Sequence, residues 1–336
     1  MRLTIVYLTF RIHPRFEWFC SSLAREFRST HDVSPEEVQV IVIDGRLWYD
    51  AHRHLGMLDA ARGLIKFEHR APKPSPWQGP SRQTQRDYFC PASARNTAFA
   101  YALAPHVAFV DDLSVLIPGW LEAHMHAAAQ GYVLLGTVSK NKNIVVDAHG
   151  ELVSFDEFPP GRDSRLGQIT EIWQVCAGSW LFGGTFSTPL ELALRVNGED
   201  EITNSIGGDD YDFGMRLGRG GGAIRISRLC ETIEDEDGHH TEGVIKITQG
   251  ATLADYEDRS GAWTVSHDRP WDGPDGPCVS NYLLNRLMRE TDRSWTIGND
   301  YGLRHVREMI LSGGEFPPVP IRPVRYWVND QLLSEL

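Results

Sequence analysis

The sequence lacks several features that would place a protein in a specialised class. Only five of its 336 residues are cysteines, and no two of them have the spacing of a metal-binding or redox pair. This scarcity excludes a disulfide-stapled scaffold and favours free thiols in a reducing compartment. No apolar run approaches the ~20 residues of a membrane helix, and the β-like N-terminus does not resemble a signal peptide. We therefore expect a cytoplasmic protein.

The chain also lacks an excess of positive charge. Its 33 Lys and Arg residues face 45 Asp and Glu residues, which gives a formal net charge of −12. This balance disfavours a general binder of polyanions, although it does not exclude a local basic groove. The composition, 41% hydrophobic and 23% charged, suits a sizeable core. With no internal repeat, one large α/β domain and a smaller C-terminal part are the simplest organisation.

Short β-branched runs alternate with stretches of helical periodicity over the first two thirds of the chain. Strands are predicted at 3–8, 38–43, 64–67, 107–110, 132–139, 144–146 and 223–226, with 132–139 and 144–146 as candidates to pair with each other. Helices are predicted at 16–27, 92–103, 118–130, 209–217, 281–289 and 301–311. Such alternation predicts a mostly parallel sheet flanked by helices.

Two acidic clusters follow these elements. An apolar strand ends in Asp111 and Asp112, and carboxyl ends of parallel strands line the crevice where α/β proteins bind ligands. Far downstream, two glycines precede Asp209, Asp210 and Asp212 at the start of a predicted helix. Asp209 and Asp212, three apart, share a helix face, and Asp210 points elsewhere. The plain alternatives are a solvated turn and a favourable interaction with the helix dipole.

Several further motifs accompany these clusters in a fixed order. They are Thr9-Phe10-Arg11, Asp44-Gly45-Arg46, Ala94-Arg95-Asn96, Asp111-Asp112 with Pro118-Gly119-Trp120-Leu121, and Asn197-Gly198-Glu199-Asp200-Glu201 followed by Gly208-Asp209-Asp210. With them, residues 1–228 resemble family-two-type glycosyltransferases. The resemblance implies the GT-A fold, which is Rossmann-like with a mostly parallel central sheet. It does not cover residues 229–336, which we expect to form a helical and irregular C-terminal extension packed on the acceptor side.

The resemblance implies an inverting transferase that moves a sugar from a nucleotide-sugar donor, most simply a UDP-sugar, to the hydroxyl of a glycan or small molecule. Asp210 matches the position of the catalytic base. The donor site would contain five residues, Thr9, Arg11, Asp44, Arg95 and Asp111. The acceptor side would contain Gly178, Trp180 and Asp209. Taken singly, an Asp-Gly turn at residue 44, a surface Arg95 and a core Trp180 are equally ordinary.

The resemblance also implies a divalent metal ion, Mn²⁺ or Mg²⁺, although the motif departs from the family pattern. Its first and third positions are both acidic in the family, whereas here they are Asp111 and Leu113. Asp112 could substitute, because Mg²⁺ accepts few protein ligands when substrate phosphates complete its shell. A third ligand would come from His240, with His239, His267, Glu234 and Asp235 as alternatives.

Two other functions fit parts of the sequence. Residues 62–95 are rich in Arg and Lys, with Trp77, Tyr88 and Phe89 between them, a pattern that can follow a phosphate backbone and stack bases. A phage-type DNA glycosyltransferase acting on a hydroxylated base is therefore one alternative. The other is a non-catalytic GT-A-like binding module, which Leu113 favours. A nucleotidyltransferase is disfavoured because no Gly-rich phosphate loop follows the first strand.

Overall fold

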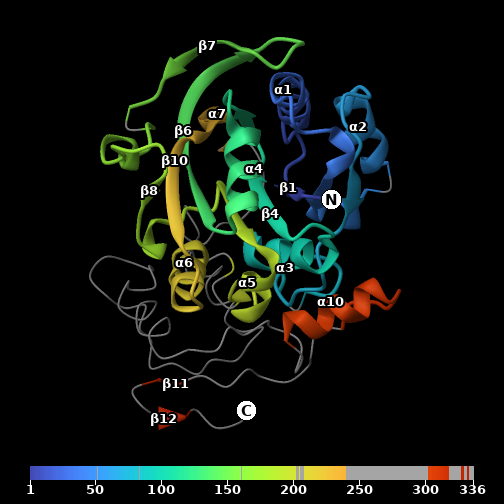
Figure 1. Cartoon of the computed structure of the whole chain (residues 1–336). Coiled ribbons are helices and arrows are strands. Elements are labelled where there is room, and N and C mark those ends of the chain that lie inside the picture. Colours follow the sequence, from blue (N-terminus) through green and yellow to red (C-terminus); the bar gives the residue numbers. More distant parts are fainter. Residues whose placement is uncertain are drawn as a thin grey trace, which may run out of the picture.

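A computed structural model describes residues 1–50, 52–82, 84–159, 161–201, 204, 208–239 (backbone only at 239) and 302–317, and the backbone of 327–328 and 331–332 (Figure 1). The predicted helix at 281–289 lies outside these residues, as do His240 and His267. The predicted helix at 301–311 is confirmed as α10 (Leu303–Leu311).

A curled ten-stranded sheet forms the centre of the molecule (Figure 1), and its main strand order is β3-β2-β1-β4-β9-β6-β10-β5. These strands are β1 (Leu3–Thr9), β2 (Val38–Asp44), β3 (Glu68–Arg70), β4 (His106–Asp111), β5 (Ser114–Leu116), β6 (Val133–Val146), β9 (Thr185–Pro189) and β10 (Ile224–Asp235). β7 (Leu152–Glu157) pairs with β6, and β8 (Gln174–Val175) pairs with β10. The mixed α/β architecture with mostly parallel central strands confirms the predicted fold class.

The parallel part of the sheet aligns the predicted site residues at one edge. Strands β3, β2, β1 and β4 are mutually parallel, and so are β6 and β10. Thr9 lies beside Asp44 in the β1–β2 register, and Leu8 lies beside Asp111 in the β1–β4 register. The carboxyl ends of three strands therefore bring Thr9, Asp44 and Asp111 to the same end of the sheet.

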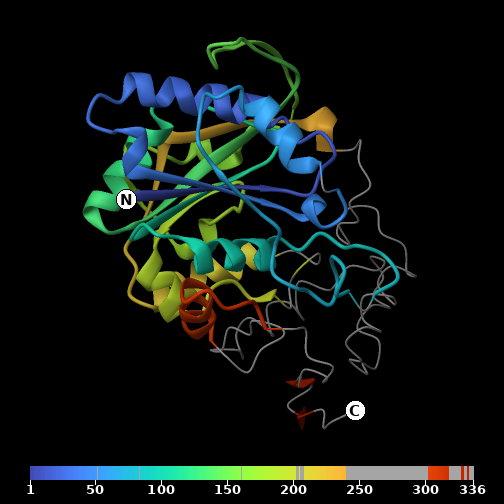
Figure 2. The ribbon, with the colours of Figure 1, turned by 90° about the vertical axis from the view of Figure 1, so that its right-hand side faces the viewer.

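Helices cover both faces of the sheet, as Figure 2 shows for α1 above it and for α3 and α10 below. One face packs against α1 (Phe16–Ser29), α2 (Arg53–Ala61) and α4 (Trp120–Gln130). The other packs against α3 (Pro91–Tyr101), α5 (Leu190–Arg195), α6 (Asp209–Arg219) and α10. Because buried strand residues alternate between these two cores, the strands are apolar on both sides, which is typical of parallel sheets.

Two strand predictions are wrong. The third strand lies at Glu68–Arg70 rather than at 64–67. The apolar residues that suggested it, Ile65 and Phe67, instead pack against the core beneath α1 and α2. Residues 132–139 and 144–146 do not pair, because both belong to the single strand β6, which continues through an irregularity at Asn143 (φ 49°).

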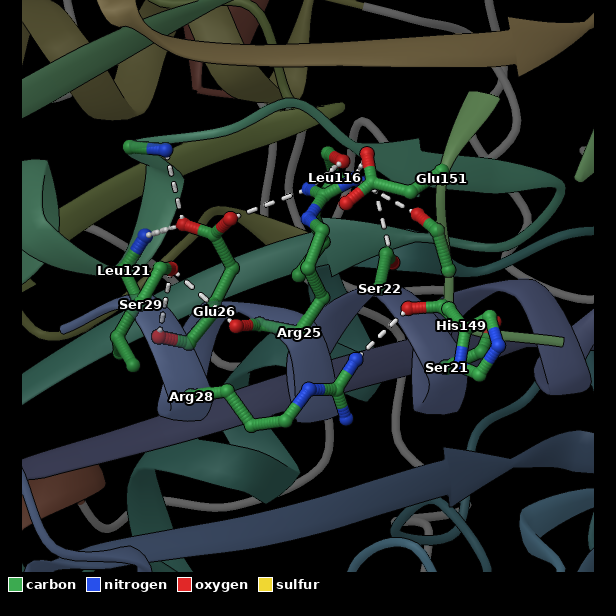
Figure 3. Close-up of polar contacts among 12 residues, drawn as sticks. Ser21, Ser22, Arg25, Glu26, Arg28, Ser29, Leu116, Leu121, His149 and Glu151 are labelled. Carbon is green, nitrogen blue, oxygen red and sulfur yellow. Dashed lines mark hydrogen bonds and ion pairs between the residues drawn. The ribbon is translucent and has the colours of Figure 1, made fainter. Parts of the chain in front are cut away.

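Helix α1 is tied to the β6–β7 turn and to the start of α4 by a buried polar cluster (Figure 3). Arg25 donates to the carbonyl oxygens of Leu116 (2.6 Å) and Gly150 (2.7 Å) and forms an ion pair with Glu26 (3.1 Å). Glu26 in turn accepts hydrogen bonds from the backbone N–H groups of Gly119 and Leu121. A carboxylate thus satisfies otherwise unpaired donors at the N-terminus of α4 and suits its dipole.

The expected domain boundary between residues 228 and 229 falls inside β10, which runs on to Asp235. Beyond it, α7 (Glu236–His239) begins directly at the end of that strand. Helix α10 packs on α3 and α5 through the buried side chains of Leu303 and Val306. The Asn197 side chain accepts a hydrogen bond from the Leu303 N–H at 2.6 Å and so joins α10 to a predicted site motif.

Candidate functional site

Arg95 lies at the centre of the candidate site. It belongs to α3, is 3% exposed, and is surrounded by carboxylates from three other segments. Its Nη1 lies 3.1 Å from Glu199 Oε2 and 3.2 Å from Asp209 Oδ2, and its Nη2 lies 3.6 Å from Asp111 Oδ1. Arg95 is thus a buried guanidinium shared among acidic groups, and not a surface helix residue.

The residue after Arg95 fixes the segment that supplies Glu199. The Asn96 side chain accepts from the Glu199 N–H (2.8 Å) and donates to the Glu199 carbonyl oxygen (2.9 Å) and to Glu201 (2.8 Å). Glu201 also forms a buried ion pair with Lys73 at 2.7 Å. In the Ala-Arg-Asn motif, Arg95 therefore contacts several carboxylates, and Asn96 fixes the backbone of Glu199, which supplies one of them.

The acidic start of α6 divides as the helix spacing predicts. Asp209 and Asp212 are buried, and Asp210 is half-buried. Asp212 accepts from Arg216 Nε at 2.6 Å, and Arg216 donates to the carbonyl oxygens of Val196 and Gly198. Arg216 is 6% exposed and fixes α6 onto the turn that precedes Glu199.

Asp210 is held at the surface of this cluster by a backbone hydrogen bond. Its Oδ2 accepts from the Gly183 N–H at 3.0 Å, and the carbonyl oxygen of Gly183 accepts from Arg95 Nη2, also at 3.0 Å. A Cβ at residue 183 would lie 2.3 Å from Arg95 Nη2, so only glycine allows this approach. Gly183 thus connects the buried Arg95 to the half-buried carboxylate of Asp210 through its carbonyl oxygen and its N–H.

Burial and neighbouring charge shift two pKa values in the cluster. Burial raises the pKa of Glu199 to about 8, with Asp209 and Asp210 adding to the rise and Arg95 opposing it. Burial alone would lower the pKa of Arg95, but Glu199, Asp111 and Asp209 outweigh it and raise that pKa above its usual range. Arg95 therefore keeps its positive charge, and burial makes Glu199 easier to protonate than a solvated carboxylate.

Asp112 is engaged by the residues that follow β1. Its Oδ2 accepts from the Thr9 hydroxyl at 2.7 Å and its Oδ1 from Arg11 Nε at 3.0 Å. Arg11 also donates to the carbonyl oxygen of Gly238 at 3.0 Å. Burial raises the pKa of Asp112, while Arg11 and Thr9 lower it. The structure thus brings Thr9, Arg11 and Asp112 together as one buried polar contact.

Asp44 is also fully buried at the end of β2. Its Oδ2 lies 2.6 Å from Arg53 Nε and 3.2 Å from His69 Nε2, and its Oδ1 accepts from the Arg46 N–H. Arg53 further donates to the carbonyl oxygen of Arg11 at 2.6 Å. Asp44 therefore holds the loop after β1 in place through Arg53, a partnership that the Asp-Gly-Arg pattern alone does not reveal.

The described residues do not form a complete set of the predicted metal ligands. Asp111 is 29% exposed at its side chain, whereas both carboxylate oxygens of Asp112 are taken by Thr9 and Arg11. Leu113 is buried in a left-handed conformation (φ 63°). Within the described ranges, no three His, Cys, Asp or Glu side chains stand close enough to hold a metal ion. His240 lies outside those ranges.

The predicted acceptor-side residues lie against α6. Gly178 is buried, and a Cβ there would lie 2.0 Å from the Gly214 carbonyl oxygen, so it lets the 3₁₀ turn Gly178–Trp180 approach the helix backbone. Trp180 is half-buried and packs against the core. Two aromatic side chains next to the site are more exposed, Phe182 at 47% and Tyr211 at 38%. They directly precede Gly183 and follow Asp210 in the chain.

The basic segment 62–95 does not form one surface. Lys73 and Arg95 are buried in ion pairs. Trp77 and Tyr88 are 1% and 0% exposed, so neither presents a face on which a base could stack. Two cations and two aromatic residues of the pattern that suggested DNA binding are therefore buried, and the embedded Trp77 is a core residue.

Four contributors to the site were missed by sequence reasoning: Glu199, Gly183, Lys73 and His69. Glu199 lies within the segment 197–201 that resembles the family motif. Its acidic side chain was the signal that could have identified it as a site residue. Gly183 lies only a few residues after Gly178 and Trp180, which were predicted on the acceptor side, but it was not itself chosen. Nothing local marks Lys73 or His69, because their partners lie far away in the chain.

No helix in the described part of the chain combines the length and the apolar character that a bilayer crossing needs.

Comparison with known proteins gives structural matches alone. No family model matches the chain, and no curated protein matches it by sequence. The fold resembles crystal structures of S. aureus TarS 1-349: the complex with UDP-GlcNAc (TM-score 0.52, 15% identity, covering 93% of this chain and 71% of that chain) and the structure without a named ligand (0.51, 12%, 99% and 96%). A longer TarS structure is similar at TM-score 0.49 and 14% identity over 70% of this chain, which spans only 37% of that chain.

The two matches to TarS 1-349, with TM-scores of 0.52 and 0.51, confirm the GT-A-like α/β fold class predicted from the sequence. The matched structures are no more than 15% identical to this chain, so they establish its fold and leave its activity to be argued from the site.

Proposed function

We propose that this chain is a glycosyltransferase that takes a sugar from a UDP-linked donor and transfers it, with inversion, to the hydroxyl of a glycan or small molecule. The observation that carries the proposal is the convergence of Asp111, Glu199 and Asp209 on buried Arg95, with Asp210 beside them at the surface. The TarS structures with the same fold contain UDP-GlcNAc and UDP, which supports a UDP-linked donor.

Asp210 is our candidate for the base. A base must be a positioned acceptor within reach of the hydroxyl proton. Asp210 meets the structural requirement because it is half-buried and one of its carboxylate oxygens is oriented by the Gly183 N–H. Its position at the edge of the cluster leaves it accessible to an acceptor, whereas Asp209 and Asp212 are each paired with a buried arginine.

The donor-side roles follow from the sheet edge. Asp111 at the end of β4 and the loop after β1, held by Thr9, Arg11 and Asp44, would bind the nucleoside diphosphate. Mn²⁺ or Mg²⁺, if bound through Asp111, would supply charge to the leaving diphosphate. Arg95 would also stabilise the negative charge of the leaving diphosphate, because its permanently charged guanidinium lies 3.6 Å from Asp111.

The first test is a thermal-shift panel of UDP, UDP-GlcNAc, GDP-sugar and CMP-sugar, each with and without Mn²⁺. A ligand that binds the folded protein at 100 times its Kd stabilises it by about 2.7 kcal/mol. We expect stabilisation by the UDP compounds, which Asp210→Asn retains. Release of UDP from the stabilising donor should fall by at least 100-fold in Asp210→Asn, since general base catalysis contributes about 10²–10⁴-fold.

Other outcomes would select another function. Stabilisation without any UDP release in a broad acceptor screen would favour the non-catalytic binding module, and stabilisation by none of the nucleotides would refute the donor site. If a product forms, its anomeric configuration measured by NMR decides between inversion and retention. DNA carrying hydroxylated bases belongs in the acceptor screen, although buried Trp77 and Tyr88 remove the pattern that favoured it.

A further inference from the structure

Glu199 is a buried carboxylate that neither binds the donor nor takes the acceptor proton in the proposed reaction. It is 0% exposed, and Asn96 fixes its backbone through both the N–H and the carbonyl oxygen. Both of its carboxylate oxygens lie near the same atom, Arg95 Nη1, at 3.1 and 3.4 Å. Burying a carboxylate is costly unless it is paired, so its presence calls for a reason beyond packing.

The contacts of Arg95 show that Glu199 competes with the site. Nη1 serves Asp209 (3.2 Å) as well as Glu199, and Nη2 serves the Gly183 carbonyl oxygen (3.0 Å) and Asp111 (3.6 Å). Since a guanidinium has a fixed fork of donors, a stronger pull from Glu199 weakens its hold on the other partners. Gly183 passes this effect on, because Arg95 contacts its carbonyl oxygen and its N–H orients Asp210.

The charges around Arg95 favour a proton on one of the acids. Asp111 from β4, Asp209 and Asp210 from α6, and Glu199 place four carboxyl groups about a single guanidinium. Of these, Glu199 is the one wholly removed from water. Like charges in a shared site disfavour simultaneous ionisation, so the proton goes to the group that water solvates least.

We propose that Glu199 is a positioning residue: a proton on Glu199 releases Arg95 to Asp209, Asp111 and the carbonyl oxygen of Gly183, the residue whose N–H orients Asp210, and loss of that proton draws Arg95 away from them. The active arrangement is then the one with neutral Glu199. The inference rests on the proposed function, because it assigns the control of charge in the same site. Burial, together with Asp209 and Asp210, raises the pKa of Glu199 to about 8 against the opposing effect of Arg95, which places the change near neutral pH.

The test compares pH profiles of UDP release from UDP-GlcNAc between pH 6 and 9.5. For the wild type, we expect the rate to fall about tenfold per pH unit above pH 8, as Glu199 ionises. Glu199→Gln, which mimics the neutral form, should stay within threefold over the same range. Glu199→Asp retains a titrating group and should retain a fall, and the matched control Glu201→Gln, a buried acid two residues away, should keep the wild-type profile.

An alkaline fall in Glu199→Gln at the same pH and slope as in the wild type would overturn the proposal, because a merely structural residue leaves the profile in place. A second readout separates this failure from failure of the proposed function. If no donor turns over at all, unfolding by urea still tests the titration. The difference in urea midpoint, wild type minus Glu199→Gln, should fall between pH 5 and pH 8 and level off above pH 8. Between these two values the folded wild type keeps the proton on Glu199, whereas the unfolded chain has lost it. A constant difference would refute the proton on Glu199.

Discussion

Replacing Arg95 by glutamine tests the central claim about the site, namely that one buried cation holds several acids together. The variant leaves Asp209 and Glu199 near each other without their shared partner, while glutamine is short enough to fit the space. Breaking a buried ion pair by removing one partner costs about 3–5 kcal/mol. We therefore expect the free energy of unfolding at pH 7, measured with urea, to fall by about this amount.

A double-mutant cycle with Glu199→Gln shows how the pair depends on pH. The pKa of Glu199 is raised from 4.5 to about 8, so below pH 8 its proton remains in the folded state. The stabilisation from protonated Glu199 is complete below pH 4.5 and is lost as the pH rises to 8. The total loss is up to about 5 kcal/mol, because each unit of pKa shift corresponds to about 1.36 kcal/mol. The coupling between Arg95 and Glu199 should therefore be larger at pH 9 than at pH 6, by about 1 kcal/mol.

Two results would refute this reasoning. A cost below about 1 kcal/mol for Arg95→Gln would mean that Asp209 and Glu199 find other partners or reach water. A coupling energy that is the same at pH 6 and pH 9 would mean that Glu199 does not change its charge between these values. Arg62→Gln is a suitable control, because Arg62 is exposed and such surface changes usually stay within about 0.5 kcal/mol.

Three further predictions concern the surroundings of the site. Gly178→Ala should lower stability by about 2 kcal/mol or more in urea unfolding, because its Cβ would meet backbone of α6, whereas Gly167→Ala, with open space around it, should cost less than about 0.5 kcal/mol. Asp112→Asn should cost about 1–3 kcal/mol by weakening two buried hydrogen bonds, and an unchanged urea midpoint would contradict their role. Glu26→Gln should cost about 1–2 kcal/mol by weakening its bonds to the start of α4, while Glu122→Gln in the first turn of the same helix serves as the control, and equal effects would count against the contact.

The sequence by itself determined the order of the elements and the edge at which the site lies. Apolar runs that end in Asp44 and Asp111 predicted strands with carboxylates at their ends, and the structure places both at one edge of a parallel sheet. Helix periodicity also separated Asp209 and Asp212 from Asp210 correctly. These inferences hold because strand alternation and helix spacing are local properties, set within a few residues.

The two wrong strand predictions arose where tertiary packing overrode a local sequence pattern. Ile65 and Phe67 are apolar because they cover α1 and α2, and not because they belong to a strand. Strand β6 continues through polar residues 140–143 because its partners β10 and β7 hold it extended. The domain boundary placed at residue 228 would cut β10, so we now propose that any division lies after Asp235.

Only the tertiary structure decided which charges meet. Arg95 and Glu199 are 104 residues apart, and Arg95 and Asp209 are 114 apart. No periodicity encodes such pairs, because they depend on how α3, α6 and the segment between them pack over the sheet. The same packing buried Trp77, Lys73 and Arg216. Local sequence patterns therefore predict which carboxylates lie at strand ends. Long-range packing decides which of them share a cation, because desolvation and ion pairing exist only once distant segments have come together.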